Sequence, residues 1–181
     1  MRSSLDFVSR TAVVIEVPEA ESIAGAWRRD LTADGALGMP PHVTILFPFI
    51  PLDEFVADDL ARLRAVAARH RIFDFALSRT AWFGDDVLWL APEPAPGFHH
   101  IIEDVATTFP ALRPYGGAHD VTVPHLTLGA SDDTAALKAA AIKVEALLPV
   151  HAKARALAIF AETADGRWAR RHVIPLGVPE R

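Results

Sequence analysis

Two short stretches of the chain carry the same pattern of residues, and both could do chemistry. Pro41-His42-Val43-Thr44-Ile45 and Pro124-His125-Leu126-Thr127-Leu128 each read proline, histidine, aliphatic, threonine, aliphatic. Successive side chains of a β-strand point to opposite faces, so each His shares a face with the Thr two residues later, about 6.6 to 6.8 Å along the strand. Two such strands facing one another would place two imidazoles and two hydroxyls around one small space.

The repeat is hard to attribute to composition. The chain has 8 His and 10 Thr in 181 residues. A bare His-x-Thr is therefore expected roughly 0.4 times, and the stricter pattern, with Pro before His and apolar residues at both aliphatic positions, about 0.01 times. A purely structural interpretation stays open, because Thr and aliphatic residues favour strands and each His could be a satisfied core or edge residue. The matched pair favours a functional site.

Two imidazoles and two hydroxyls around one space suit a phosphodiester. Displacement at phosphorus proceeds with the entering and leaving oxygens roughly in line. A neutral His could take a proton from the entering oxygen while a protonated His delivers one to the leaving oxygen, because both forms of imidazole are available near neutrality. The Thr hydroxyls could donate hydrogen bonds to the non-bridging oxygens, where charge builds up. Such a site needs no metal.

The paired motifs His42-Val43-Thr44 and His125-Leu126-Thr127 resemble the signature of the 2H phosphoesterase superfamily, which contains the bacterial 2′-5′ RNA ligase-like proteins and cyclic nucleotide phosphodiesterases. The resemblance spans nearly the whole chain in element order and motif placement. It implies a bilobal fold of two pseudo-symmetric antiparallel sheets, with the motif residues lining a central groove. It also implies metal-independent phosphoesterase chemistry, without a cofactor, on a 2′,3′-cyclic phosphate, a related cyclic phosphate or a 2′-5′ linkage.

By this resemblance His42 and His125 are the catalytic acid and base, and Thr44 and Thr127 hold the phosphate. The chain departs from the RNA-ligase branch after the second motif. That branch is expected to have a basic residue shortly after it, whereas Gly129-Ala130-Ser131 follows here. The departure favours a phosphodiesterase over a ligase and leaves the phosphate to be held by another residue as well.

Alternating strands and helices surround the two motifs. The apolar patterns predict strands over 11–17, 42–50, 72–78, 81–83, 87–91, 152–163 and 168–176 and at the second motif, and helices over 18–30, 53–70, 98–109 and 131–149. A loop rich in glycine and proline precedes each motif, a helix follows each, and the motifs lie 83 residues apart. Hairpins mixed with helices favour an α+β fold with antiparallel sheets and helices packed outside. We expect a single bilobal domain over residues 1–181.

Composition limits the class of partner. The net charge of −5 and the pI of about 5.9 argue against a broad footprint for duplex nucleic acid. The chain has no cysteine, which excludes disulfides and thiolate metal sites, and no apolar segment reaches the length of a membrane span. We therefore expect a cytoplasmic monomer that binds a small nucleotide or an RNA end bearing a cyclic phosphate, with no metal, duplex nucleic acid or membrane as partner.

Residues outside the motifs are candidates for substrate contact. Trp168, Arg170 and His172 alternate along the last expected strand, and we expect them to share one face. Base stacking and phosphate contact would suit Trp168 and Arg170, and a solvated strand face is the alternative. Tyr115 and His119 lie in the loop before the second motif. They could contact substrate or could be ordinary loop residues.

Two other classes of function use the same residues. A binding module could hold an RNA end or a nucleotide with the same four groups and never turn it over. A histidine-based metal site is a poorer fit, because two imidazoles and two neutral hydroxyls make a weak set of ligands. Product formation from a cyclic nucleotide separates an enzyme from a binding module, and activity unchanged by a chelator disposes of the metal site.

Overall fold

The computed structural model of the chain describes residues 9–113 and 122–177. Within these ranges the chain forms eight strands and five α-helices. The strands are β1 (Thr11–Glu16), β2 (His42–Leu46), β3 (Phe73–Phe83), β4 (Val87–Glu93), β5 (Leu126–Ala130), β6 (Val150–Ala154), β7 (Ala156–Glu162) and β8 (Trp168–Pro175). The helices are α1 (Glu21–Leu31), α2 (Ala33–Ala36), α3 (Ala57–Arg69), α4 (Pro96–Thr108) and α5 (Thr134–Glu145), with a 3₁₀ turn η1 (Pro18–Ala20) before α1.

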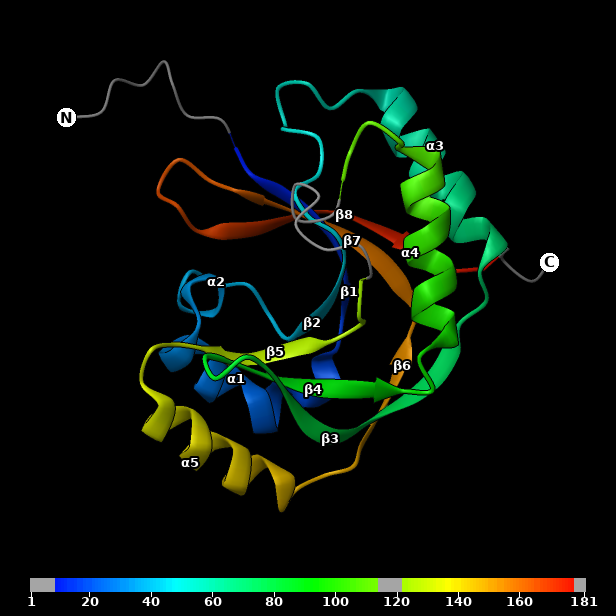
Figure 1. Ribbon diagram of the computed structural model, residues 1–181. Helices are drawn as coiled ribbons and strands as arrows, with labels where there is room; N and C mark the ends of the chain where they lie inside the picture. Colours follow the sequence, from blue (N-terminus) through cyan, green and yellow to red (C-terminus); the bar gives the residue numbers. More distant parts are fainter. Residues whose placement is uncertain (1–8, 114–121, 178–181) are drawn as a thin grey trace.

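The strands form two four-stranded antiparallel sheets, in the orders β2-β1-β7-β8 and β5-β4-β3-β6. Both motif strands, β2 and β5, therefore lie at an edge of their sheet, and these two edges contact each other. Figure 1 shows β2 and β5 side by side where the two sheets meet. The expected α+β architecture of two antiparallel sheets is confirmed.

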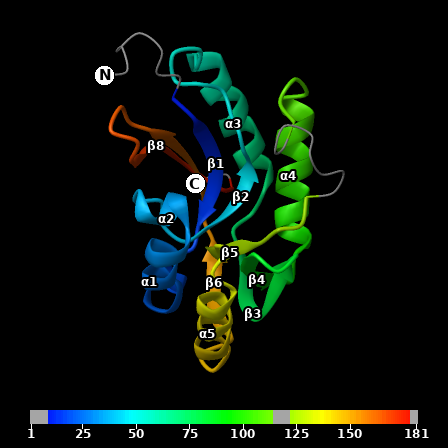
Figure 2. The same ribbon diagram turned by 60° about the vertical axis from the view of Figure 1, so that its left-hand side comes forward.

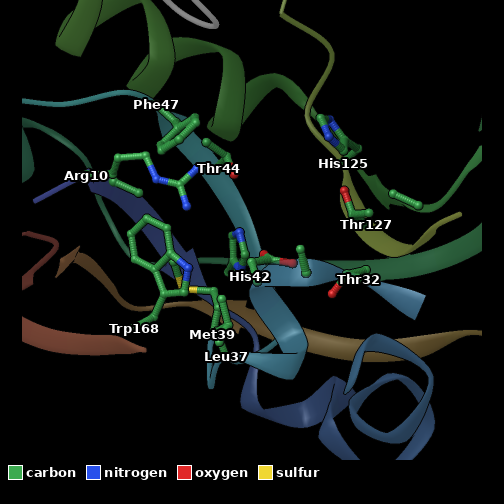
Figure 3. A pocket seen from close by; sticks show the side chains of 14 residues that line it. Arg10, Thr32, Leu37, Met39, His42, Thr44, Phe47, His125, Thr127 and Trp168 are labelled. Carbon is green, nitrogen blue, oxygen red and sulfur yellow. The ribbon is translucent and has the colours of Figure 1, made fainter. Parts of the chain in front are cut away.

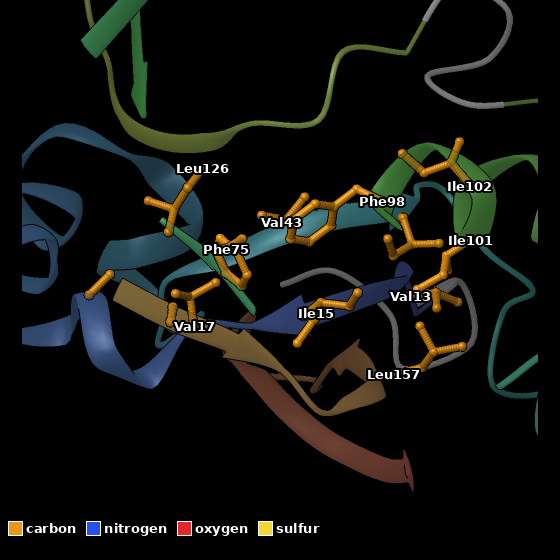
Figure 4. Close-up of a cluster of buried hydrophobic side chains, with 14 of the residues drawn as sticks. Val13, Ile15, Val17, Val43, Phe75, Phe98, Ile101, Ile102, Leu126 and Leu157 are labelled. Atoms are coloured by element: carbon orange, nitrogen blue, oxygen red, sulfur yellow. The ribbon is translucent and has the colours of Figure 1, made fainter. Parts of the chain in front are cut away.

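One continuous apolar core joins the two sheets and decides which way the motif side chains point. Val43 and Leu126, the aliphatic residues between the His and Thr of the two motifs, are completely buried in it. Figure 4 shows both in one cluster with Ile15 of β1 and Phe98 of α4. Because strand side chains alternate, a one-residue slip would expose this apolar face, at a cost of about 25 cal/mol for each Å². His and Thr of both motifs must therefore face away from the core.

The helices cover the core in two pairs. α3 packs against α4, and these helices contact β8 and β2, respectively. They lie side by side in both Figure 1 and Figure 2. α1 packs on β5, and α5 contacts α1, β3 and β4. Helix α1 therefore follows a strand of the first sheet in sequence but packs against the motif strand of the second. None of the helices in the described part of the chain has the length and apolarity needed to cross a membrane.

Two strand assignments from the sequence need correction. The strands expected over 72–78 and 81–83 are one strand, β3, in which Ser78 is accommodated as a bulge opposite β4. The strand expected over 152–163 is two strands, β6 and β7, which pair in different sheets. The chain crosses from the second sheet to the first between them, at Arg155. Local apolar pattern cannot distinguish one long strand from two that share a boundary residue.

The first motif strand ends at Leu46 rather than at the expected residue 50. Pro48 has no N–H to give to the ladder, which interrupts the strand there. Phe49 then regains a hydrogen bond, with its N–H donating to the carbonyl oxygen of Thr11 at 2.9 Å. The expected direction of the segment is therefore kept, although its regular pairing is shorter.

The last helix begins at Thr134 rather than at the expected residue 131. The side chain of Asp133 accepts a hydrogen bond from the N–H of Ala136 at 3.0 Å and is the N-cap. Ser131 accepts instead from the N–H of Asp133 at 3.1 Å. Both residue types favour this position, and the side-chain hydrogen bond decides between them.

Candidate active site

The side chains of both motifs line one cleft between the sheets. His42 and Thr44 belong to β2, while Thr127 belongs to β5 and His125 lies just before that strand begins. All four line a cavity of about 350 Å³. Figure 3 shows the two imidazoles and the Thr127 hydroxyl around the same space. Residues half the chain apart are therefore brought together, as the repeated pattern predicts.

Each imidazole is held by a hydrogen bond of the same kind, from Nδ1 to a backbone carbonyl two residues earlier. Nδ1 of His42 lies 2.7 Å from the carbonyl oxygen of Pro40, and Nδ1 of His125 lies 2.7 Å from that of Val123. A carbonyl can only accept, so each Nδ1 carries a proton and donates it. Nε2 is then the nitrogen of each ring that is left to accept or deliver a proton in the cleft.

The proline before each His helps to orient the ring. A residue that precedes proline is restricted to extended conformations, and the proline ring fixes its own φ. The carbonyl two residues before His42 or His125 is therefore held in a narrow range of directions. Pro41 and Pro124 are thus a physical part of the motif, because each restricts the residue before it, whose carbonyl oxygen accepts the hydrogen bond that sets the His tautomer.

His42 is a deeply buried ring, with 8% of its surface exposed. Its pKa is lowered from 6.5 to about 4, first by burial and then by the positive charge of Arg28 and by the His125 ring, against the opposing effects of the Asp34 carboxylate and the Pro40 carbonyl. His42 is therefore neutral at pH 7 in the free protein.

His125 lies against two aromatic rings of the second sheet. The centroids of Phe83 and Trp89 are 5.0 and 5.9 Å from that of the imidazole, both in edge-on geometry. The two aromatic rings stack on each other at 4.8 Å. Burial lowers the pKa of His125 from its ordinary value of 6.5, against the hydrogen bond to Val123. Both imidazoles of the free cleft thus favour the neutral form at pH 7.

A buried arginine connects the second motif to the entrance of the first. Arg28 of α1 is 1% exposed, and its Nη1 donates to the carbonyl oxygen of Thr127. Its Nη2 donates to Oδ2 of Asp34 at 2.9 Å, and Asp34 also lines the cleft. Burial acts to raise the pKa of Asp34, but Arg28 and His42 outweigh it and hold that pKa below its ordinary value. An ionised carboxylate and a guanidinium therefore accompany His42.

The other end of the cleft is aromatic. Trp168 of β8 and Phe47 meet edge to face with ring centroids 6.3 Å apart, and the guanidinium carbon of Arg10 lies 5.8 Å from the Trp168 ring. Arg10 also pairs with Glu162, with Nε 2.9 Å from Oε2. Figure 3 shows Arg10, Phe47 and Trp168 on the opposite side of His42 from His125. This end offers a flat apolar surface with one cation beside it.

The structure brings five of the eight predicted site residues to the cleft, namely the two His-x-Thr pairs and Trp168. Arg170 lies on the same face of the sheet as Trp168 but outside the cleft lining, with Nη1 3.1 Å from Oε1 of Glu16. Tyr115 and His119 fall outside the described residues. Their contact with substrate stays a prediction.

The expectation that His172 shares this face was wrong. In the pairing of β7 with β8, Phe160 lies opposite Arg170 but Ile159 lies opposite His172, so Arg171 is the extra residue of a bulge. A bulge shifts the alternation by one residue. The His172 ring therefore lies on the other face, 5.7 Å from the ring of Phe55.

Three charged residues at or behind the cleft were not predicted as site residues: Arg10, Arg28 and Asp34. One signal was present, because the uncharged segment after the second motif implied that a cation must come from elsewhere. Arg28 reaches Thr127 across 99 residues of sequence. No local pattern indicates a contact of that separation. Phe47 also lies at the cleft.

The arrangement can transfer protons on both sides of one small ligand. Each imidazole has Nε2 free of the carbonyl that binds Nδ1, and the hydroxyls of Thr44 and Thr127 line the same cleft. Across residues 9–113 and 122–177, no group of three or more His, Asp or Glu side chains is arranged to hold a metal ion. The groups present are those of acid–base chemistry and of anion binding.

Comparisons with known proteins agree with this geometry. The model of the 2′-5′ RNA ligase superfamily matches residues 16–166, which include both motifs. Among solved structures, the chain is similar to E. coli LigT in its apo form, at 19% identity and a TM-score of 0.57, over 94% of this chain and 99% of that one. LigT complexed with 3′-AMP gives 18% and 0.58 with the same coverage.

TT0787 of Thermus thermophilus is similar at 18% identity and a TM-score of 0.63, over 94% of this chain and 100% of that one. No curated protein matches the chain in sequence. At these sequence identities the similarity to solved structures shows the fold, and the match to the family model shows the family.

Proposed function

Because the chain belongs to the 2′-5′ RNA ligase superfamily, we propose that it is a metal-independent phosphodiesterase that opens a 2′,3′-cyclic phosphate, a related cyclic phosphate or a 2′-5′ linkage. The substrate is a small nucleotide or an RNA end, and the two histidines supply the acid and the base. We also propose that the reaction is hydrolysis rather than ligation and that it needs no cofactor. The protein is proposed to be cytoplasmic, with no membrane partner.

In the proposed hydrolysis a water molecule attacks the phosphorus of the cyclic phosphate. Nε2 of one neutral imidazole takes a proton from this water as the new P–O bond forms. The P–O bond to one ribose oxygen breaks, and the other imidazole, protonated, gives its proton to that oxygen, which leaves a nucleoside monophosphate. Thr44 and Thr127 donate hydrogen bonds to the non-bridging oxygens. The roles of His42 and His125 exchange when the reaction runs in reverse.

The observation that carries the proposal is the matched orientation of the two imidazoles. Each Nδ1 is bonded to the carbonyl oxygen two residues earlier, at 2.7 Å in both motifs. Each ring therefore keeps Nε2 for the cleft, which both threonines also line. Two histidines in ordinary structural roles would have no reason to repeat this geometry 83 residues apart.

The cleft supports a substrate of nucleotide size. Its volume of about 350 Å³ lies at the low end for small-molecule sites. Trp168 and Phe47 suit stacking against a base, and Arg10 suits a phosphate or a carbonyl oxygen of the ligand. LigT has been solved with 3′-AMP and with NADP+, which supports a ligand of this class. Arg170 would contact only a ligand that extends beyond the cleft.

A substrate screen with single-residue variants tests the proposal. The protein is assayed with chelator present on 2′,3′-cyclic nucleotides, ADP-ribose 1″,2″-cyclic phosphate and 2′-5′ dinucleotides, with the double variant of His42→Ala and His125→Ala as blank. Each single variant should lose about 10²- to 10⁴-fold in kcat. His151→Ala, an exposed histidine of β6, is the matched control and should keep full activity. Full activity of both motif variants rejects the proposal.

The pH dependence of kcat/KM gives the same screen a second readout. The reactive form carries one proton on the two imidazoles, whichever ring holds it. Since the pKa of His42 is about 4 and that of His125 is lowered from 6.5, this form is most abundant on the acid side of neutrality. We expect a bell that rises through about pH 4 and falls as His125 loses its proton. A profile that neither rises through about pH 4 nor falls at higher pH would contradict two-histidine catalysis.

The same lowered pKa values favour a second candidate, a module that binds a nucleotide or RNA end without turning it over. With both rings neutral at pH 7, the cleft holds a base and lacks a ready acid. Calorimetric binding of a 2′,3′-cyclic nucleotide is compared with product formation at pH 5 and pH 7.5, at high protein concentration. Binding at both values without product at either supports the binding module.

A further inference from the structure

Arg28 is a buried cation with two specific hydrogen-bond partners. Its side chain is 1% exposed, and a charge so deeply buried is costly unless it is paired. Nη1 donates to the carbonyl oxygen of Thr127, and Nη2 donates to Oδ2 of Asp34 at 2.9 Å. Within the described residues Nε has no hydrogen-bond partner. The hydrogen bonds of Nη1 and Nη2 therefore offset the free-energy cost of burying the charge.

The two acceptors belong to the two halves of the site. Thr127 lies in β5, the motif strand of the second sheet, and 99 residues separate it from Arg28. Asp34 lies in α2, in the connection that leads from α1 to His42 at the start of β2. A single guanidinium thus fixes the second motif strand relative to the segment that delivers the first.

Asp34 is held in position by the turn around it. Thr32 Oγ1 donates to the carbonyl oxygen of Arg28 at 2.7 Å and accepts from the N–H of Gly35 at 2.9 Å. A Cβ at Gly35 would lie 2.4 Å from the carbonyl oxygen of Arg28, so only glycine allows this close approach. The α1–α2 corner, defined here as residues 28–35, is therefore built to bring a carboxylate to the guanidinium.

Charged and titratable groups face His42 from each element around it. Arg28 approaches from α1, Asp34 from α2 and His125 from across the cleft, and all three act on the protonation of His42. Glu16 lies opposite His42 on β1 but is engaged in an ion pair with an arginine of β8. Arg10 also lines the cleft but pairs with Glu162. The two fixed charges that act on His42 are therefore Arg28 and Asp34, which are joined to each other.

We propose that Arg28 and Asp34 form a positioning pair for the reaction proposed above. The pair holds the two His-x-Thr strands at the spacing that an in-line displacement requires, and Arg28 does this from behind β5 without touching the substrate. The two charges also form part of the electrostatic environment of His42. The inference rests on the proposed function for its catalytic consequence. Its effect on His42 is a property of the free protein.

The fork geometry makes arginine specific at this position. A planar guanidinium can serve two acceptors in fixed directions, whereas an ammonium is a point charge on a flexible stem. Arg28→Lys should therefore keep the charge near His42 but loosen the link between the strands. Misplacement of a reacting group by about 1 Å costs on the order of 10²-fold in rate. We expect Arg28→Lys to lower kcat by about this factor while KM changes by less than about threefold.

The proton occupancy of His42 is measured by NMR titration of the imidazole signals, which needs no substrate. Arg28→Met removes a nearby cation, so the pKa of His42 should rise from about 4. Asp34→Asn removes a nearby anion, so the same pKa should fall. Arg28→Lys keeps the cation and should leave it near the wild-type value. Opposite shifts from two members of one pair are not expected from a general loosening of the fold.

Arg29→Met is the matched control. Arg29 is the next residue of α1, but its side chain is 59% exposed and pairs with Glu21 at 2.8 Å. This variant should change neither kcat nor the His42 titration. If Arg28→Met does not fold, the Lys and Asn variants still test both parts of the proposal. Wild-type kcat in Arg28→Lys together with an unmoved His42 titration in Asp34→Asn overturns it. A wild-type protein that turns over none of the cyclic phosphates rejects the proposed function, while the titrations still decide the effect of the pair on His42.

Discussion

At the scale of single residues, the burial of His42 links the site to the stability of the fold. The pKa of this ring is lowered from 6.5 to about 4 in the folded protein, so the unfolded chain takes up the proton first as the pH falls. The contribution of neutral His42 to stability is therefore complete above about pH 6.5 and is lost as the pH falls toward 4. Burial of the first motif histidine thus makes the protein more sensitive to acid.

This coupling predicts the pH dependence of a variant that cannot titrate at position 42. Between pH 7.5 and pH 5 the free energy of unfolding should fall by about 2 kcal/mol more in the wild type than in His42→Gln. Urea unfolding at both pH values measures the two differences. His151→Gln, at an exposed position, should behave as the wild type. Equal pH dependence of the wild type and His42→Gln would show that His42 is not buried as a neutral ring.

At the scale of elements, the α1–α2 corner does the most for the site with the fewest residues. Thr32 ends one helix and caps the next, since its side chain accepts from the N–H of Gly35 at 2.9 Å. The corner is sharp because Gly35 lies against the carbonyl oxygen of Arg28. The same helix end therefore positions Asp34 at the cleft and Arg28 behind β5.

Two glycines of this region should respond oppositely to alanine. In Gly35→Ala the new Cβ would lie 2.4 Å from the backbone oxygen of Arg28, and overpacking of this kind costs about 1 to 3 kcal/mol. In Gly25→Ala the three atoms nearest to the new Cβ all belong to the side chain of Glu21, which can turn away, and helix propensity favours alanine by about 1 kcal/mol. Urea unfolding and kcat are measured for both. A Gly35→Ala protein as stable and active as Gly25→Ala would contradict the role of the corner.

At the scale of the whole molecule, the two sheets share one core. The buried cluster contains Ile15 and Leu157 from the first sheet together with Leu90 and Leu126 from the second. The cleft lies on the faces turned away from this cluster, where the motif strands meet at the sheet edges. Stability and the geometry of the cleft therefore depend on the same contact between sheets.

A shared core predicts that both sheets unfold in one transition. The chain has four tryptophans, of which Trp168 lies in the first sheet and Trp89 in the second. Two variants that each keep one of these as their single tryptophan follow the sheets separately by fluorescence. Leu126→Ala, at a fully buried position, should cost about 2 to 5 kcal/mol and should move both midpoints together. Two separate transitions in urea would instead show two independently stable lobes.

Much of the site was predictable because its signals are local. The order His, aliphatic, Thr implies one outward and one inward face of a strand, and Val43 and Leu126 do point into the core. The bulge in β8 was not predictable in the same way, because strand alternation carries no sign of the extra residue Arg171. A bulge is decided by pairing with the neighbouring strand, which the residues of β8 alone do not specify.

By itself, the sequence predicted the family through a resemblance. It also predicted the α+β class and the faces of the two motif strands, because spacing and alternation along a strand are properties of neighbouring residues. Only the tertiary structure decided that Arg28 binds the carbonyl of Thr127, that Arg10 and Trp168 form the other end of the cleft, and that β6 and β7 part into different sheets. Such contacts depend on how separate elements pack. The free energy of these contacts depends on burial and charge pairing across the whole fold, so it cannot be predicted from any short segment of the chain.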